Sequence, residues 1–198
     1  MKHVDGKAAG ALIFVGAVQF VLCVIIAEAL YPAYSISENY ISDLGVGVSA
    51  PIFNASVFTL GLAAVASVYF MRSFIQDKIF LIFLSLCGIG AMGVGVFPEN
   101  YGLIHTFVSL IAFLFGALSA IASYKIQKPP LSYLAAVLGL ISLAALVLFG
   151  ISEVGVHLGG GQAADFYLGL GKGGMERMIA YPIILWAAGF GGHLMGKF

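Results

Sequence analysis

Three stretches of polar side chains, separated by long apolar runs, hold the residues that could carry out chemistry. They contain hydroxyl groups, carboxylates, an imidazole and two cations: Tyr40, Ser42, Asp43, Glu99, His105, Lys172, Glu176 and Arg177. A carboxylate beside a histidine can move protons, and an arginine can hold an anion through paired N–H groups. We therefore predict that the three stretches form one polar pocket.

Glu153 and His157 suggest a metal site, the first of three chemistries that these residues could support. They stand four residues apart, so a helical turn would place both on one face. Together with His105, Glu99 or Asp43 they could supply the nitrogen and oxygen ligands of a zinc-like divalent cation. The chain has no H-E-x-x-H motif and no repeated C-x-x-C. The sequence leaves the cofactor unknown, with a divalent metal as one alternative.

A serine hydrolase is the second chemistry. Ser35, Ser37 or Ser42 would be the nucleophile. The base would be His105 or His157, and Asp43 would orient it. The chain lacks the G-x-S-x-G motif that would mark such a nucleophile. This alternative therefore rests on residue types alone.

Anion recognition is the third chemistry and the one that we favour. Arg177 and Lys172 could bind a lipid phosphate, one through paired N–H groups and the other as a point charge. The rings of Tyr31, Tyr34 and Tyr40 would lie at the depth of the lipid headgroups, where tyrosine is enriched. The predicted ligand is therefore a lipid headgroup or a similar amphiphile.

The elements that must position these residues are membrane-spanning helices. The chain of 198 residues is 61% hydrophobic and only 9% charged, whereas soluble domains carry about 25% charged residues. Its apolar runs have about the 20 residues that a ~30 Å hydrocarbon core requires, without the alternation of a barrel strand. The first run is longer than the ~7–15 residues of a signal-peptide core, so we expect it to remain as a helix. We predict an all-α integral membrane protein, one domain over residues 1–198, with six transmembrane helices at about 8–30, 51–71, 79–97, 103–124, 133–152 and 178–195.

Basic residues predict the orientation of this bundle. With six helices, seven of the nine basic residues share one side of the membrane: Lys2, Lys7, Arg72, Lys78, Lys125, Lys128 and Lys197. The positive-inside rule makes that side cytoplasmic. We predict cytoplasmic N- and C-termini and a polar pocket on the outer face of a multi-pass protein of the cell membrane. Zero net charge and the lack of a basic patch exclude nucleic acid as a partner. Membrane lipids are the expected partners, and a membrane-protein partner or a homo-oligomer stays open.

Two glycine-rich segments resemble nucleotide-binding motifs but lack their context. Residues 88–93 match G-x-G-x-x-G inside an apolar run rather than after a strand. We predict that these small residues let helices approach closely. Residues 169–174 contain a lysine that is followed by glycine rather than by serine or threonine. We expect this segment to be a flexible hinge that enters the last helix.

The order of the motifs resembles a prokaryotic family of six-helix membrane proteins, the domain of unknown function 998. The resemblance is carried by residues 41–45 (ISDLG) after the first helix, by residues 97–99 (FPE) with His105, and by residues 174–177 (GMER) before a helix with Tyr181 and Trp186. It implies site positions at Ser42, Asp43, Gly45, Pro98, Glu99, His105, Glu176 and Arg177. The architecture is also loosely similar to the FRAG/DRAM/Sfk group of membrane proteins. The family has no established activity, so the resemblance implies a fold and positions but no reaction.

Together these observations predict an outer-face pocket that binds a lipid headgroup or similar amphiphile, and they leave open whether the protein also acts on that ligand as a lipid-modifying or hydrolytic enzyme. Asp43 and His105 would be the acid–base pair, Arg177 the anion holder, and Glu176 its partner or the orienter of His105. One alternative is a non-enzymatic accessory or structural subunit of a membrane complex, whose charges would point apart. Another is a metal-dependent intramembrane hydrolase. A catalytic site requires Asp43, His105 and Arg177 to converge on one cavity.

Overall fold

The computed structural model describes residues 2–157 and 167–198, and helices are the only regular secondary structure over these residues. Six of the helices are long and apolar enough to cross a membrane. They are α1 (Lys2–Leu30), α2 (Ala50–Met71), α3 (Lys78–Val96), α4 (Leu103–Ala122), α5 (Leu131–His157) and α6 (Gly171–Lys197). The predicted fold class, an all-α integral membrane protein with six transmembrane helices, is confirmed.

Local signals set several of the helix ends. Asp77 precedes α3, and its side chain accepts the amide N–H of Phe80 at 3.1 Å, which satisfies one of the free donors of the first turn. Pro51 occupies the start of α2, where its missing N–H costs nothing. Gly102 precedes α4 with φ of 57°, a conformation that suits glycine.

The start of α6 differs from the expectation. The helix begins at Gly171 rather than near residue 178, so Lys172, Glu176 and Arg177 lie on the helix and not in a connection. Pro182 consequently falls inside α6. Gly171 and Gly173 have a low helix propensity. They are nevertheless required here, because residues 36–39 of the first connection pack so closely on them that a side chain would not fit.

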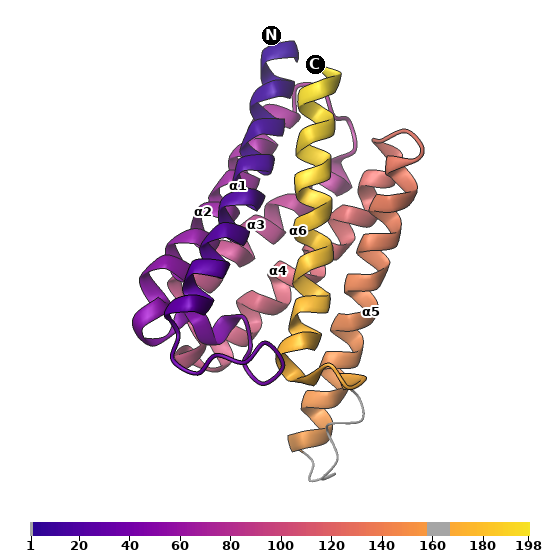
Figure 1. Cartoon of the computed structure of the whole chain (residues 1–198). Helices are drawn as coiled ribbons and strands as arrows, with labels where there is room; N and C mark the ends of the chain where they lie inside the picture. Colours follow the sequence, from indigo (N-terminus) through magenta and orange to yellow (C-terminus); the bar gives the residue numbers. More distant parts are fainter. Residues whose placement is uncertain (1, 158–166) are drawn as a thin grey trace.

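The helices form a ring in which each packs against its neighbours in the sequence (Figure 1). Helix α6 closes the ring by packing on α1, and it also contacts α4. Small residues permit these approaches: a Cβ on Gly88 would lie 2.7 Å from the Gly61 carbonyl oxygen, and one on Gly90 would lie 2.5 Å from the Ala112 nitrogen. The predicted packing role of residues 88–93 is confirmed.

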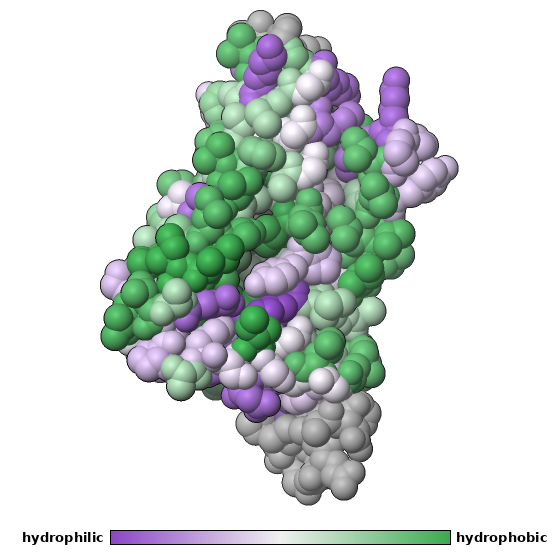
Figure 2. Space-filling view, in the orientation of Figure 1, coloured by the Kyte–Doolittle hydropathy of each residue, from purple (hydrophilic) through white to green (hydrophobic). Residues whose placement is uncertain are grey.

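The two chain termini lie at the same end of the bundle (Figure 1). We call the opposite end the site end; it contains the first connection (31–49), the third connection (97–102) and the start of α6. Figure 2 shows an apolar surface over the middle of the bundle, with hydrophilic residues toward both ends. The cytoplasmic placement of the termini follows from the positive-inside rule and stays a prediction.

Candidate functional site

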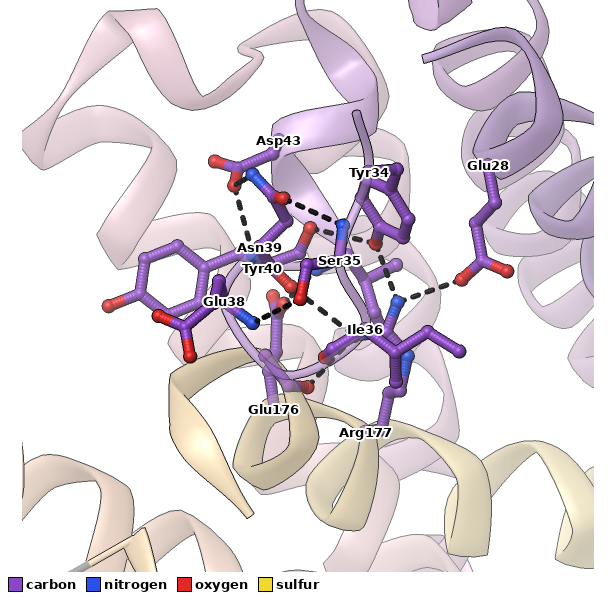
Figure 3. A network of polar contacts seen from close by, with 12 residues as sticks. Glu28, Tyr34, Ser35, Ile36, Glu38, Asn39, Tyr40, Asp43, Glu176 and Arg177 are labelled. Carbon is purple, nitrogen blue, oxygen red and sulfur yellow. Dashed lines mark hydrogen bonds and ion pairs between the residues drawn. The ribbon is translucent and has the colours of Figure 1, made fainter. Parts of the chain in front are cut away.

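Arg177 is the centre of a buried polar network at the site end (Figure 3). Its side chain is only 8% exposed and pairs with Glu28 of α1, with Nη2 and Oε1 2.7 Å apart. The two terminal nitrogens also donate to the Tyr34 hydroxyl and to the carbonyl oxygens of Ile36, Asn39 and Gly173. Arg177 therefore fastens the first connection and α1 to the last helix.

These contacts do not support the predicted role of Arg177 in holding an anion. A phosphate would need the terminal N–H groups that already donate to Glu28, Tyr34 and main-chain carbonyls. The Nε atom is buried and has no hydrogen-bond partner among the described residues. The physical reason for the difference is that a buried guanidinium is stable only when it is paired, and the protein supplies those partners itself.

The glycines at the start of α6 form a seat for the first connection. The Gly173 amide donates to the Ser37 carbonyl at 2.9 Å, and the Ser37 hydroxyl donates to the Leu170 carbonyl at 3.1 Å. A Cβ on Gly173 would overlap the Asn39 carbonyl oxygen. Gly171 has φ of 73° and would meet Ser37 in the same way. The expected flexible hinge is therefore a packed helix end.

Asp43 lies in a second cluster, where the first and third connections meet. One oxygen of its carboxylate accepts the Asn39 side-chain N–H at 2.9 Å and the Tyr40 amide at 3.0 Å. Its carboxyl group also shares a hydrogen bond with Glu99, the first residue of the 3₁₀ turn η3 (Glu99–Tyr101). Lys172 supplies a nearby positive charge, with its ammonium 4.5 Å from the centre of the Tyr40 ring.

The two carboxyl groups of this cluster hold protons differently. Burial works against ionisation of Asp43, but hydrogen bonds, led by that from Glu99, outweigh it and lower the pKa of Asp43. Burial, and then the hydrogen bond to Asp43, raise the pKa of Glu99 to about 8. At neutral pH Glu99 is therefore the protonated donor and Asp43 the ionised acceptor.

Glu176 occupies a different position, beneath the first connection and inside the bundle. It is 6% exposed, and its carboxylate accepts the backbone N–H groups of Ile41 and Ser42. These amides belong to the start of the short turn η1 (Ser42–Gly45). Glu176 thus holds η1 over the end of the bundle. Asp43 is the next residue of this turn after Ser42, and its side chain belongs to the neighbouring cluster.

His105 does not pair with Asp43. Its Nδ1 lies 2.8 Å from the Phe97 carbonyl oxygen and its Nε2 lies 3.2 Å from the Ser109 hydroxyl. Because a carbonyl only accepts, Nδ1 carries the proton and Nε2 accepts from Ser109. No hydrogen bond or ion pair joins His105 to Asp43 in the part of the chain that the structure describes. The predicted acid–base pair is therefore not assembled, because the histidine caps the end of α3 instead.

Glu153 is engaged by tyrosines. Its Oε1 accepts the hydroxyl of Tyr40 at 2.8 Å and that of Tyr167 at 2.7 Å. Burial, and then these bonds, raise the pKa of Tyr40 and bring the pKa of Tyr167 to about 12. The described residues contain no group of three His, Cys, Asp or Glu side chains arranged to hold a metal. The side chain of His157, the other predicted ligand, lies outside the described residues.

An apolar cavity of about 80 Å³ lies inside the ring, directly under η1. Helices α1, α2, α3, α4 and α6 line it, and the α6 lining consists of Glu176, Ala180, Ile183 and Ile184. These positions follow i, i+4, i+7 and i+8 and so form one face of the helix. A second hollow of about 50 Å³ continues it toward Trp186 and shares part of its wall.

The polar residues of the cavity wall gather at its site end. They are Ser42, Ser109 and Glu176, and the remaining lining is apolar except for the thiol of Cys87. Asp43, His105 and Arg177 are not among the lining residues. The predicted convergence of these three residues on one cavity is therefore not found, and Glu176 is the ionisable carboxyl that faces the hollow.

Several residues of the site were not singled out by sequence reasoning. Asn39 positions Asp43, Ser109 bonds His105 and lines the cavity, and Cys87 borders both hollows. Ser109 stands four residues after His105, which is a usable signal for a side-chain contact on a helix. Cys87 and the carbonyl partners of Arg177 leave no such signal, because those contacts depend on how distant segments pack.

The fold and the site define a multi-pass membrane protein with a closed polar cap over an apolar interior. Residues 14–193 match the model of a protein family, and the chain belongs to that family, described as Protein of unknown function (DUF998). The predicted family is thereby confirmed. The chain matches no curated protein and no solved structure. The more distant similarity to the FRAG/DRAM/Sfk group stays a prediction.

Proposed function

We propose that this protein binds a membrane amphiphile at the site end, with the apolar part of the ligand inside the ring of helices. The observation that carries the proposal is the cavity under η1, whose walls are apolar except at one end. Binding sites for small molecules are concave and mostly apolar, with a few polar groups that fix orientation. Ser42, Ser109 and Glu176 supply such groups here.

The arrangement of charges favours a ligand site over an accessory subunit. In an accessory subunit the charges of the site end would point apart. Here Asp43 and Glu99 are bonded to each other, and the charge of Lys172 affects the pKa of both carboxyl groups. The charge of Glu176 also affects the pKa of Glu99. The proposal is restricted to binding, because His105 bonds to Phe97 and Ser109 and has no acidic partner among the described residues.

Native mass spectrometry of the protein, released from mild detergent, tests the proposal. The wild-type protein is expected to carry an added mass that belongs to a small amphiphile. Ala91 lines both hollows, and Ala91→Leu should fill them and abolish the added mass. Ala144→Leu is the matched control, because Ala144 is exposed on α5, which does not line the cavity.

Two outcomes would contradict the proposal. One is a wild-type protein that carries no ligand and takes up none when it is incubated with single-chain amphiphiles. The other is equal retention by the Ala91→Leu and Ala144→Leu proteins, which would place the ligand on the outer surface of the bundle.

A further inference from the structure

Among the described residues, Glu176 is the one ionisable carboxyl in the wall of the cavity, which is otherwise apolar apart from Ser42, Ser109 and the thiol of Cys87. We infer that the site selects a slim, single-chain amphiphile whose polar end donates a hydrogen bond, as an alcohol or a protonated amine does, and rejects phosphate and carboxylate head groups. This inference rests on the proposed binding function and adds the chemical class of the ligand.

The carboxyl group of Glu176 has the capacity to accept from a ligand. One oxygen accepts the Ile41 amide, and the Ser42 amide contributes a second bond. A carboxylate has about four lone-pair positions, so it can accept further donors. A negatively charged head group at the same place would instead leave two anions together in a medium of low dielectric constant, which is strongly unfavourable.

The two cations of the site end do not face the cavity and are engaged elsewhere. Arg177 is enclosed by Glu28, Tyr34 and main-chain carbonyls. Lys172 lies over the Tyr40 ring and next to the Asp43 and Glu99 pair. Neither cation is part of the cavity wall. An anionic head group in the cavity would therefore meet the Glu176 carboxyl group without a cation in direct contact.

The size of the two hollows limits the apolar part of the ligand. Their volumes are about 80 and 50 Å³, and a dry protein cavity of about 150 Å³ binds benzene. The hollows therefore suit a few carbon atoms of a slim chain rather than the two tails of a phospholipid. Along α6 they run from Glu176 to Ala187, which is about 16 Å at the rise of an α-helix.

Cys87 offers a reporter for this prediction because its thiol borders both hollows. The other cysteine, Cys23, is replaced in a Cys23→Ala protein. The rate of Cys87 modification by methyl methanethiosulfonate is followed by intact mass in a neutral detergent. The competing compounds are n-hexanol, n-hexylamine, n-hexanoate and n-hexyl phosphate, which share one chain length and differ in the head group.

We expect n-hexanol and n-hexylamine to slow the modification, and the two anions to leave its rate unchanged. At roughly ten times the dissociation constant, mass action predicts about a tenfold slower reaction. The Glu176→Gln protein keeps an acceptor oxygen but loses the charge, so it should lose the protection by n-hexylamine and keep that by n-hexanol. If this variant does not fold, the comparison of the four compounds on the Cys23→Ala protein still decides the question.

The outcomes separate the inference from the proposed function. Equal or better protection by n-hexanoate or n-hexyl phosphate would overturn the head-group preference while leaving amphiphile binding in place. Failure of all four compounds to slow the reaction, together with no ligand in native mass spectrometry, would overturn the proposed function itself.

Discussion

Asp43 and Glu99 share one hydrogen bond, which joins the first connection of the bundle to the third. The two residues are 56 positions apart in the sequence (99 minus 43). The bond needs one proton, because two adjacent ionised carboxylates would repel each other and neither could donate. The closure of the site end is therefore linked to pH.

Stability should depend on pH through Glu99. Its pKa is raised to about 8 by burial and by Asp43, whereas an unfolded glutamate titrates near pH 4.3. The stability that a raised pKa provides is fully present below the unfolded value and is lost as the pH rises through about 8. The melting temperature should therefore fall between about pH 5 and pH 8 and level off above that range.

The Glu99→Gln protein provides the comparison for this pH series. Glutamine donates to Asp43 at every pH in this range, so the melting temperature of the variant should change less than that of the wild type. The pKa of Asp43 is lowered, so its own contribution is lost only at acidic pH and does not enter this window. Parallel pH curves for the two proteins would show that Glu99 does not carry the dependence.

Removal of the Arg177 side chain should destabilise the protein severely. Arg177→Ala leaves the partly buried Glu28 with its charge unpaired, and breaking a buried pair costs at most roughly 3–5 kcal/mol. Arg177→Lys should recover little, because an ammonium cannot reach the same set of acceptors as a guanidinium. Unfolding by a denaturant in detergent measures the free energy of unfolding of both variants. Arg72→Ala is the matched control, since Arg72 is exposed and lies over the Tyr69 ring; a similar loss there would contradict the argument.

A methyl group at position 173 should separate α6 from the first connection. The Gly173→Ala side chain would overlap the Asn39 carbonyl oxygen, so the variant should unfold at a lower temperature than the wild type. Gly192→Ala on the same helix meets open space and should be neutral, or stabilising by up to about 1 kcal/mol through helix propensity. Equal melting temperatures for the two variants would contradict the close packing of the first connection on Gly173.

The hydroxyl groups of Tyr40 and Tyr167 should act together on Glu153. Each replacement by phenylalanine removes one hydrogen bond, with an expected cost of about 1 kcal/mol. Because both bonds end on the same oxygen, the double variant should show a non-additive loss in a double-mutant cycle. Strict additivity would indicate that the two tyrosines stabilise the protein through separate contacts.

The fold could be predicted from the sequence because lipid imposes a length on every helix. Six apolar runs of sufficient length specify the elements, because only helices satisfy the backbone polar groups within lipid. The beginning of α6 could not be predicted in this way. Gly171 and Gly173 weaken a helix when they are judged by propensity, but they are required by the backbone of residues 36–39 that lies on them.

The membership of the site could be predicted better than the roles of its residues. Asp43, Glu99 and Glu176 were expected to share one end of the bundle, and they influence one another there. The predicted roles of Arg177 as an anion holder and of His105 as the acid–base partner of Asp43 are not supported by the groups that they contact. The partners are the Glu28 carboxylate, 149 positions away, and a main-chain carbonyl of Phe97. Neither partner is visible as a pattern, because both result from the packing of helix ends.

The pairing of Glu28 with Arg177 also sets the order in which the protein can be assembled. Glu28 belongs to α1 and Arg177 to α6, so the carboxylate is synthesised well before its cation. Until α6 enters the membrane, the Glu28 carboxylate and the carbonyl groups of Ile36 and Asn39 cannot bind Arg177. The cap over the cavity is therefore completed last, and a nascent chain that stops before α6 cannot close it.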